Sequence, residues 1–197
     1  HVYVITLDTT PIRQRYMAHM MAEFGLAYSM VVASPVDRST QFRYNMSYEN
    51  YLSAGELGCL LSHLWCLSDA VVHDRQRIAI FEDDVMFRHD WIEQLERILG
   101  GPSMSLAPDF LMLGASDHTF ASTNSTRVKD NCVYRPSPHS NILGTHAIMY
   151  SLSAAKYVLE QKMRVPSRID GDLMGVFGVF AESAFICSPN LCCCEQS

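Results

Sequence analysis

Three consecutive acids, Glu82, Asp83 and Asp84, follow directly after the apolar run of residues 77–81. Neighbouring carboxylates repel one another unless a cation or a basic group lies beside them. On an extended backbone, Glu82 and Asp84 point to one side and Asp83 to the other. Two carboxylates on one side suit a hard divalent cation such as Mn²⁺ or Mg²⁺, which keeps positions open for phosphate oxygens. The pattern predicts a metal site at Glu82 and Asp84; the alternative is a solvated acidic turn or a cap for the next helix.

A second group of residues that could bind a ligand follows the first apolar run of the chain, where Thr6 and Leu7 lead into Asp8. A strand end followed by a helix N-terminus is a natural place for a phosphate or the edge of a nucleotide. Arg13 and Arg15 lie in the expected helix, and arginine binds a diphosphate through two parallel hydrogen bonds. The alternative is that Asp8 is an ordinary helix cap and that the arginines form a solvated face.

The run Gly55–His63 reads Gly-Glu-Leu-Gly-Cys-Leu-Leu-Ser-His. Helical spacing places Glu56, Ser62 and His63 on roughly half of one helix face. A lone histidine on a helix is more often a structural residue than a ligand, so composition alone assigns this run no function.

Strand and helix patterns alternate along the chain, which predicts an α/β sandwich with a largely parallel sheet. A proline at the first helical position begins the first helix, Gly25 ends it, and a capping box of Ser53 and Glu56 begins another. Two further helices are expected after Asp90 and Ser153. The expected strands cover residues 2–7, 27–33, 77–81, 110–113, 142–150 and 184–187, with a hairpin near 126–134. Residues 34–51 are expected to form a loop, and the chain after Pro166 to be largely irregular. Such sheets bind ligands at the carboxyl ends of their strands.

Composition excludes several classes of protein. At 197 residues the chain is long enough for one domain, residues 1–197, and it begins inside a strand-like run, so we expect a piece of a longer protein. The net charge of −6 argues against nucleic-acid binding, and no apolar segment reaches the roughly 18 residues of a membrane span. The seven cysteines form no disulfide framework. We therefore expect free thiols in a reducing compartment and a cytoplasmic location.

Taken together, the motifs resemble glycosyltransferase family 25, which includes lipopolysaccharide sugar transferases and procollagen galactosyltransferases. The resemblance covers nearly the whole chain. Its motifs are Leu7-Asp8 with the following arginines, Gly55–His63, Ile80–Val85, Gly144–Ala147 with Tyr150, and Pro166–Asp170. One departure is Thr6, which stands where the family usually has asparagine.

The resemblance implies a GT-A-type, nucleotide-sugar-binding sandwich with helices on both sides of a mostly parallel sheet. It implies that Glu82 and Asp84 hold Mn²⁺ or Mg²⁺. The residues implied near the donor nucleotide are Thr6, Leu7, Asp8, Arg13, Glu56, His63 and Asp83. The implied activity is transfer of a hexose from a UDP-sugar to a hydroxyl of a glycan or glycoprotein.

An inverting transfer also requires a carboxylate base near the acceptor hydroxyl. Asp170 and Asp172, which flank Gly171, are the candidates, and either can instead be a further metal ligand. The alternative is that these residues form a plain Asp-Gly-Asp turn.

Two other functions compete with this prediction. A receiver-like phosphoryl-transfer domain needs an acidic pair after its first strand and a lysine near a late strand, whereas the acids here follow the third expected strand. A non-catalytic scaffold or glycan-binding module retaining the same fold is the second alternative. An intact acidic cluster argues against it, because an inactive domain has no need of repelling carboxylates.

Overall fold

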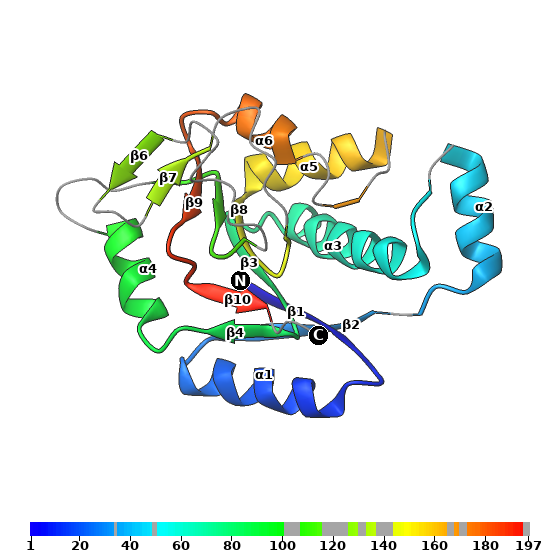
Figure 1. Cartoon of the computed structure of the whole chain (residues 1–197), viewed down its shortest axis with the longest axis horizontal. Helices are drawn as coiled ribbons and strands as arrows, with labels where there is room; N and C mark the ends of the chain where they lie inside the picture. Colours follow the sequence, from blue (N-terminus) through cyan, green and yellow to red (C-terminus); the bar gives the residue numbers. More distant parts are fainter. Residues whose placement is uncertain are drawn as a thin grey trace.

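The computed structural model describes residues 1–33, 35–48, 51–100, 107–115, 126–129, 133–136, 144–164, 168–169 and 173–194. Strands and helices alternate through most of the chain (Figure 1). The strands are β1 (Val2–Leu7), β2 (Tyr28–Ala33), β3 (Arg77–Glu82), β4 (Val85–Phe87), β5 (Phe110–Met112), β6 (Thr126–Lys129), β7 (Val133–Arg135), β8 (Ala147–Ser151), β9 (Ala184–Cys187) and β10 (Cys192–Cys194). The helices are α1 (Pro11–Glu23), α2 (Arg38–Tyr48), α3 (Ala54–Val72), α4 (Trp91–Gly100), α5 (Leu152–Arg164) and α6 (Leu173–Val179).

The central sheet has eight strands in the order β2-β1-β3-β8-β5-β9-β7-β6. Following the pairings across it, β8 and β7 run opposite to the other six strands. The predicted α/β sandwich with a mostly parallel sheet is therefore confirmed. The parallel strands β2, β1 and β3 are neighbours, so their carboxyl ends meet at one edge.

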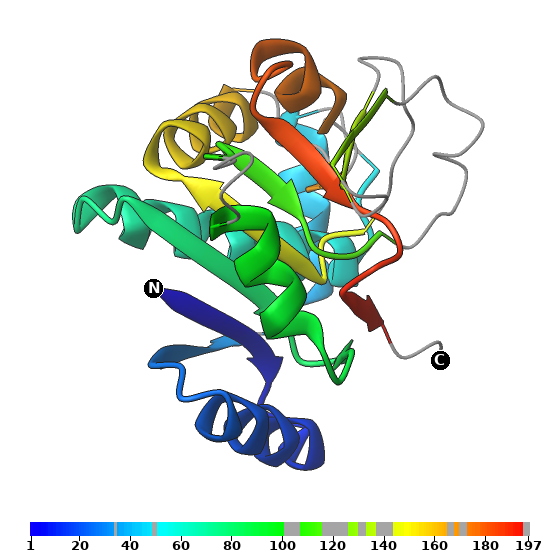
Figure 2. The ribbon, with the colours of Figure 1, turned by 90° about the vertical axis from the view of Figure 1, so that its left-hand side faces the viewer.

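Helices cover both faces of this sheet (Figures 1 and 2). Alternate strand residues point to opposite faces, so Tyr3 and Ile5 join one core while Val4 joins the other. Helices α3, α5 and α6 contribute to the first core, and α1 and α4 to the second. The two cores fix α1 and α3 on opposite faces of β1. The carboxyl end of β1 therefore lies between the first turns of these two helices.

Both helices that flank this opening begin as the sequence predicts. Pro11 occupies the first turn of α1, and Gly25 follows that helix with a φ of 64°. In α3, the Ser53 side chain accepts a hydrogen bond from the Glu56 N–H, while the Glu56 carboxylate accepts one from the Ser53 N–H. This reciprocal cap fixes the entry of α3 beside the sheet edge.

The prediction of a loop over residues 34–51 is wrong, because Arg38–Tyr48 forms helix α2. The Asp37 carboxylate accepts hydrogen bonds from the Thr40 N–H and the Ser39 hydroxyl, which caps the first turn. Side chains of Gln41 and Asn45 then donate to the Leu52 carbonyl. Polar contacts rather than an apolar stripe support this helix, so it leaves no hydrophobic period in the sequence.

The C-terminal region is more regular than predicted. Leu173–Val179 forms helix α6, and β10 pairs antiparallel with β4 in a separate two-stranded sheet. The expected strand at 184–187 and the hairpin of β6 and β7 are confirmed. Among the described helices, none combines the length and the apolar character needed to cross a membrane.

Candidate functional site

A cavity of about 520 Å³ opens at the carboxyl ends of β1, β2 and β3. This is the position at which an open α/β sheet binds its ligands. Its lining comes from the strand ends and from the first turns of α1 and α3: Ile5, Thr6, Leu7, Thr9, Arg13, Ala33, Pro35, Val36, Ala54, Gly55, Gly58, Cys59, Ser62, Glu82, Asp83 and Asp84. All three acids of the predicted metal motif therefore lie at one cavity.

The cavity lining is divided between charged and small apolar residues. Arg13 and the three acids supply the charge, whereas Ala33, Pro35 and Val36 with the first turns of α3 supply small or apolar groups. Packing does not require the α3 glycines, since a Cβ at Gly55 meets nothing within 4 Å and one at Gly58 meets only Val36 Cγ2, at 3.8 Å. The first turns of α3 thus present bare backbone to the cavity at a cost in helix stability.

Asp83 ties the end of β3 to the start of α1. Its Oδ2 accepts hydrogen bonds from the hydroxyls of Thr6 and Thr10, both at 2.6 Å, and its Oδ1 lies 3.6 Å from Arg13 Nη1. Asp83 is buried, so these contacts compensate for the loss of water around its charge. Asp83 therefore orients Arg13 and the first turn of α1 at the cavity.

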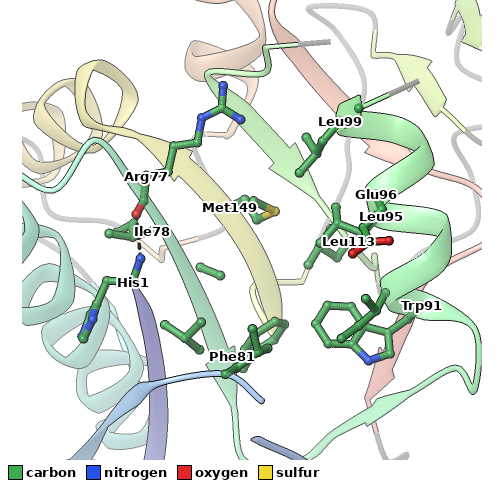
Figure 3. Close-up of a pocket in the computed structure, with 15 residues that line it drawn as sticks. His1, Arg77, Ile78, Phe81, Trp91, Leu95, Glu96, Leu99, Leu113 and Met149 are labelled. Atoms are coloured by element: carbon green, nitrogen blue, oxygen red, sulfur yellow. Dashed lines mark hydrogen bonds between the residues drawn. The ribbon is translucent and has the colours of Figure 1, made fainter. Parts of the chain in front are cut away.

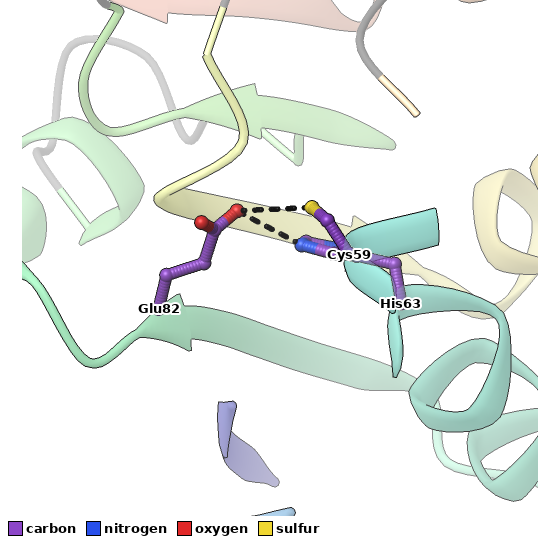
Figure 4. Close-up of side chains that lie close together, drawn as sticks. All are labelled: Cys59, His63 and Glu82. Atoms are coloured by element: carbon purple, nitrogen blue, oxygen red, sulfur yellow. Dashed lines mark hydrogen bonds and ion pairs between the residues drawn. The ribbon is translucent and has the colours of Figure 1, made fainter. Parts of the chain in front are cut away.

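Glu82 ties the same strand end to α3 and to the residues before β8. Its Oε1 lies 3.1 Å from His63 Nε2 and 3.8 Å from Cys59 Sγ (Figure 4). The same oxygen lies 2.5 Å from Thr145 Oγ1. Burial alone would raise the pKa of Glu82, but the hydrogen bond and electrostatic effect of His63, the hydrogen bond from Thr145 and the electrostatic effect of His146 together lower the pKa to about 2. Glu82 is therefore held as a carboxylate at neutral pH.

We expect the free energy of unfolding to fall as the pH is lowered from about 5 to about 2, in part because of Glu82. Its folded-state pKa of about 2 lies below the ordinary value of 4.5. The stability that it contributes is thus present above the ordinary pKa and is lost as the pH falls through the folded-state value. Urea unfolding in the presence of a chelator, at a series of pH values, measures this dependence.

The Glu82→Gln variant should show a shallower loss of stability over that range than the unsubstituted chain. The matched control is Glu182→Gln, which changes a side chain that is 86% exposed. Equal slopes for Glu82→Gln and the unsubstituted chain would contradict the assignment.

Asp84 differs from its two neighbours because one of its carboxylate oxygens is buried without a partner among the described residues. Its Oδ1 is buried and accepts no hydrogen bond from any described residue. Burial first, and then the nearby Glu82 carboxylate, raise the pKa of Asp84 above its ordinary value. A buried carboxylate oxygen with no hydrogen-bond donor destabilises the fold unless a cation or a ligand binds to it.

The backbone does not stay extended through the three acids, so the condition for placing Glu82 and Asp84 on one side is not met. β3 ends at Glu82, and Asp83 and Asp84 form a turn that leads into β4. The turn directs Asp83 toward α1 while Glu82 contacts α3. Simple alternation along a strand therefore does not describe how these side chains are divided.

Other residues predicted near a donor nucleotide lie in different positions. Thr6, Leu7 and Arg13 line the cavity, whereas Asp8 and Arg15 are exposed and absent from its lining. Asp170 and Asp172 lie outside the described residues.

Glu56 and His63 adjoin the cavity without lining it. Glu56 completes the α3 cap and lies 2.6 Å from Arg168 Nε. His63 is fully buried and reaches the site through Glu82. Both positions agree with roles in supporting the cavity wall.

A second cavity, of about 500 Å³, has a different character (Figure 3). It lies between the sheet and α4 and is lined mainly by apolar side chains, among them Phe81, Trp91, Leu95 and Met149. Among the described residues that line it, Glu96 is the only one with a carboxylate. Its described lining contains no pair of acids that could hold a cation for a diphosphate, so the first cavity is the candidate site.

Comparison with known proteins decides the family. Residues 1–173 match the family described as glycosyltransferase family 25 (LPS biosynthesis protein). The chain belongs to this family. This confirms the resemblance seen in the sequence. Three of its motifs contribute residues to the cavity lining: Leu7 with Arg13, the run Gly55–His63, and the acids at 82–84.

Relatives within family 25 are distant. The chain is 30% identical over 112 residues to "Inactive glycosyltransferase 25 family member 3" of Mus musculus, covering 50% of this chain and 19% of that protein. It is 36% identical over 126 residues to the Homo sapiens protein of the same name, covering 57% of this chain and 21% of that protein. The matches thus span about a fifth of the length of these relatives.

Among solved structures, the chain is similar to a glycosyltransferase involved in the glycosylation of the major capsid of PBCV-1. The TM-score is 0.43 and the sequence identity 10%, with 100% of this chain and 94% of that chain covered.

Sequence reasoning missed three residues that organise the site. Thr10 donates to Asp83, Thr145 donates to Glu82, and Cys59 lies against the same Glu82 oxygen. Thr145 and Cys59 stand inside the family motifs, but nothing in their spacing indicates a shared partner. Only the antiparallel pairing of β3 with β8 brings Thr145 to the end of β3.

Proposed function

We propose that this chain transfers a hexose from a UDP-sugar to a hydroxyl of a glycan or glycoprotein, in a reaction that depends on Mn²⁺ or Mg²⁺. The observation that carries the proposal is the lining of this cavity in a family 25 chain. Charged residues, among them Arg13 and Asp84, form one part of the lining, and the backbone of the first turns of α3 forms another. A nucleoside diphosphate has matching parts, since its phosphates are anionic and its base is flat.

The residues present fit a divalent cation. The Oδ1 of Asp84 is buried without a partner among the described residues, and the pKa of this carboxyl is raised, so a cation would stabilise the group. Asp84 would hold the ion, with Glu82 beside it as the second carboxylate. When bound, the cation neutralises charge on the diphosphate leaving group.

The chain's own residues supply the remaining charge and positioning. Arg13 offers a guanidinium to the diphosphate, and Asp83 holds it in place at 3.6 Å. Because Asp83 is itself fixed by Thr6 and Thr10, little reorganisation is needed when charge develops.

The chemical step forms one bond and breaks another. The acceptor oxygen bonds to the anomeric carbon, the bond from that carbon to the phosphate oxygen breaks, and the nucleoside diphosphate leaves. The acceptor proton passes to a carboxylate base if the reaction inverts the anomeric centre. Asp170 and Asp172 are the candidates for that base.

Replacing Gly58 by alanine should weaken donor binding by about tenfold or more without loss of stability. The added methyl group enters the cavity, and overpacking of a filled site typically costs about 1–3 kcal/mol. In the empty protein the same group makes only an ordinary contact with Val36. Alanine also favours the helix over glycine by up to about 1 kcal/mol. Calorimetric titration of a UDP-sugar with Mn²⁺ and thermal unfolding measure the two effects.

The matched control is Gly178→Ala in α6, where an added Cβ meets nothing within 4 Å and where no donor is expected. Unchanged donor affinity in Gly58→Ala would show that the donor does not lie against α3.

The second candidate function is a non-catalytic module with the same fold. It is favoured by the names of the mouse and human relatives, which describe them as inactive. Thermal unfolding with a panel of nucleotide sugars, with and without Mn²⁺, separates the two. Stabilisation by one donor only when metal is present supports catalysis, whereas no stabilisation by any donor supports the module.

A further inference from the structure

Three potential metal ligands of different chemistry meet beside the cavity. Cys59 and His63 are four residues apart on α3 and therefore lie on one helix face, while Glu82 ends β3. One ligand atom from each side chain lies within 4.8 Å of the other two (Figure 4). The distances from Glu82 Oε1 are 3.1 Å to His63 Nε2 and 3.8 Å to Cys59 Sγ.

We propose that Cys59, His63 and Glu82 form a binding site for a thiophilic divalent cation, Zn²⁺, which shares Glu82 with the site proposed for the donor's cation but does not include Asp84. Zinc binds sulfur at about 2.3 Å and nitrogen or oxygen at about 2.0–2.2 Å in a tetrahedron. Ligand atoms of such a site are about 3–4 Å apart, and the two distances from Glu82 fall in that range. A cation at the centre of these atoms therefore requires little movement of the backbone.

The donor set favours zinc over the harder cations. Thiolate and imidazole ligands suit Zn²⁺, whereas Mn²⁺ and Mg²⁺ prefer oxygen. On binding, the Cys59 thiol loses its proton and the sulfur becomes the ligand. The Thr145 hydroxyl, 2.5 Å from Glu82 Oε1, orients the carboxylate as an outer-shell partner.

The site is expected to be exchangeable rather than structural. It has three protein ligands, and catalytic zinc sites with three ligands keep a fourth position open. When Nε2 of His63 binds the ion, the ring proton moves to Nδ1, which is buried and has no partner in the described part of the chain. This lowers the affinity relative to a four-ligand structural site, so a chelator should remove the ion while the fold persists.

A bound zinc ion would adjoin the donor cavity, because Cys59 and Glu82 both line it. Zinc is therefore expected to compete with donor binding. This consequence rests on the proposed function, whereas zinc binding itself does not.

Cobalt substitution tests the site directly. Co²⁺ added to the metal-free chain should produce a thiolate-to-cobalt absorption band that stoichiometric Zn²⁺ abolishes. The Cys59→Ser variant, which exchanges only sulfur for oxygen, should lose the band and bind Zn²⁺ at least about 100-fold more weakly. Loss of an outer-shell partner already weakens metal binding by up to about 100-fold, and Cys59 would be a direct ligand. The matched control is Cys193→Ser, which alters the exposed thiol of β10 and should retain both properties.

Two further variants make the outcome decisive. Glu82→Gln should also weaken zinc binding, so the test does not depend on the correct folding of Cys59→Ser alone. Asp84→Asn should leave zinc binding unchanged. Absence of a band in the unsubstituted chain, or its persistence in Cys59→Ser, would overturn the proposal. Failure of the proposed function looks different, because it removes Mn²⁺-dependent donor binding and leaves the cobalt band intact.

Discussion

Asp84→Asn is expected to lower metal-dependent sugar transfer by about 100- to 1,000-fold, the usual effect of losing one preorganised charge at a reacting centre. The substitution keeps the shape of the side chain and removes the negative charge that would hold the cation. It should not destabilise the metal-free protein, because burial and Glu82 already make the ionised form of Asp84 unfavourable. Activity and stability should therefore respond in different ways.

Initial rates of transfer at several Mn²⁺ concentrations, with thermal unfolding in a chelator, measure both responses. Asp74→Asn is the matched control, since Asp74 is exposed and precedes β3 at the end opposite to the cavity. Unchanged metal-dependent turnover in Asp84→Asn would remove the basis of the proposed function. A large loss of metal-free stability would instead assign Asp84 a structural role.

Gly114→Ala is expected to reduce the free energy of unfolding by about 3 kcal/mol, the upper end of the range for overpacking. A Cβ at Gly114 would lie 1.9 Å from the Cys192 carbonyl oxygen and 2.6 Å from His146 Nε2. The first of these atoms is backbone, so β10 must move away to accommodate it. That movement strains the hydrogen bonds that Leu191 and Cys192 donate to the Leu113 carbonyl, at 2.7 and 3.2 Å.

Urea or thermal unfolding measures this loss, which corresponds to about 6–12 °C in Tm for a chain of this size. Gly100→Ala is the matched control, because an added Cβ there meets nothing within 4 Å. Equal stability of the two variants would show that β10 does not pack against Gly114 in solution.

Local patterns were sufficient to predict most of the fold. The apolar runs, the proline at the start of α1 and the capping box of α3 act through neighbouring residues, so they are readable in one sequence. Helix α2 was missed because side-chain hydrogen bonds rather than an apolar face support it. The pairing of β10 with β4 was missed because it joins residues about 100 positions apart through backbone groups that every sequence shares.

The candidate site was predicted in outline but not in its internal contacts. The acids of the 82–84 motif and Arg13 were expected at the sheet edge, and the cavity includes them. Their individual partners were not foreseen, because Thr10, Thr145 and Cys59 come from three separate segments. Asp8 and Arg15 fit the same sequence pattern as Arg13, yet only Arg13 lines the cavity.

The alternation of strands and helices, the family and the acidic motif after the third strand can all be read from one sequence, because they depend on residue type and short spacing. The separate partners of the three acids follow from long-range packing: Glu82 contacts α3, Asp83 contacts α1, and a buried oxygen of Asp84 has no partner in the part of the chain that the structure describes. The physical reason is the turn at residues 83–84 between two helices on opposite faces of the sheet. Adjacent carboxylates there meet different surroundings, which no spacing along the chain can specify.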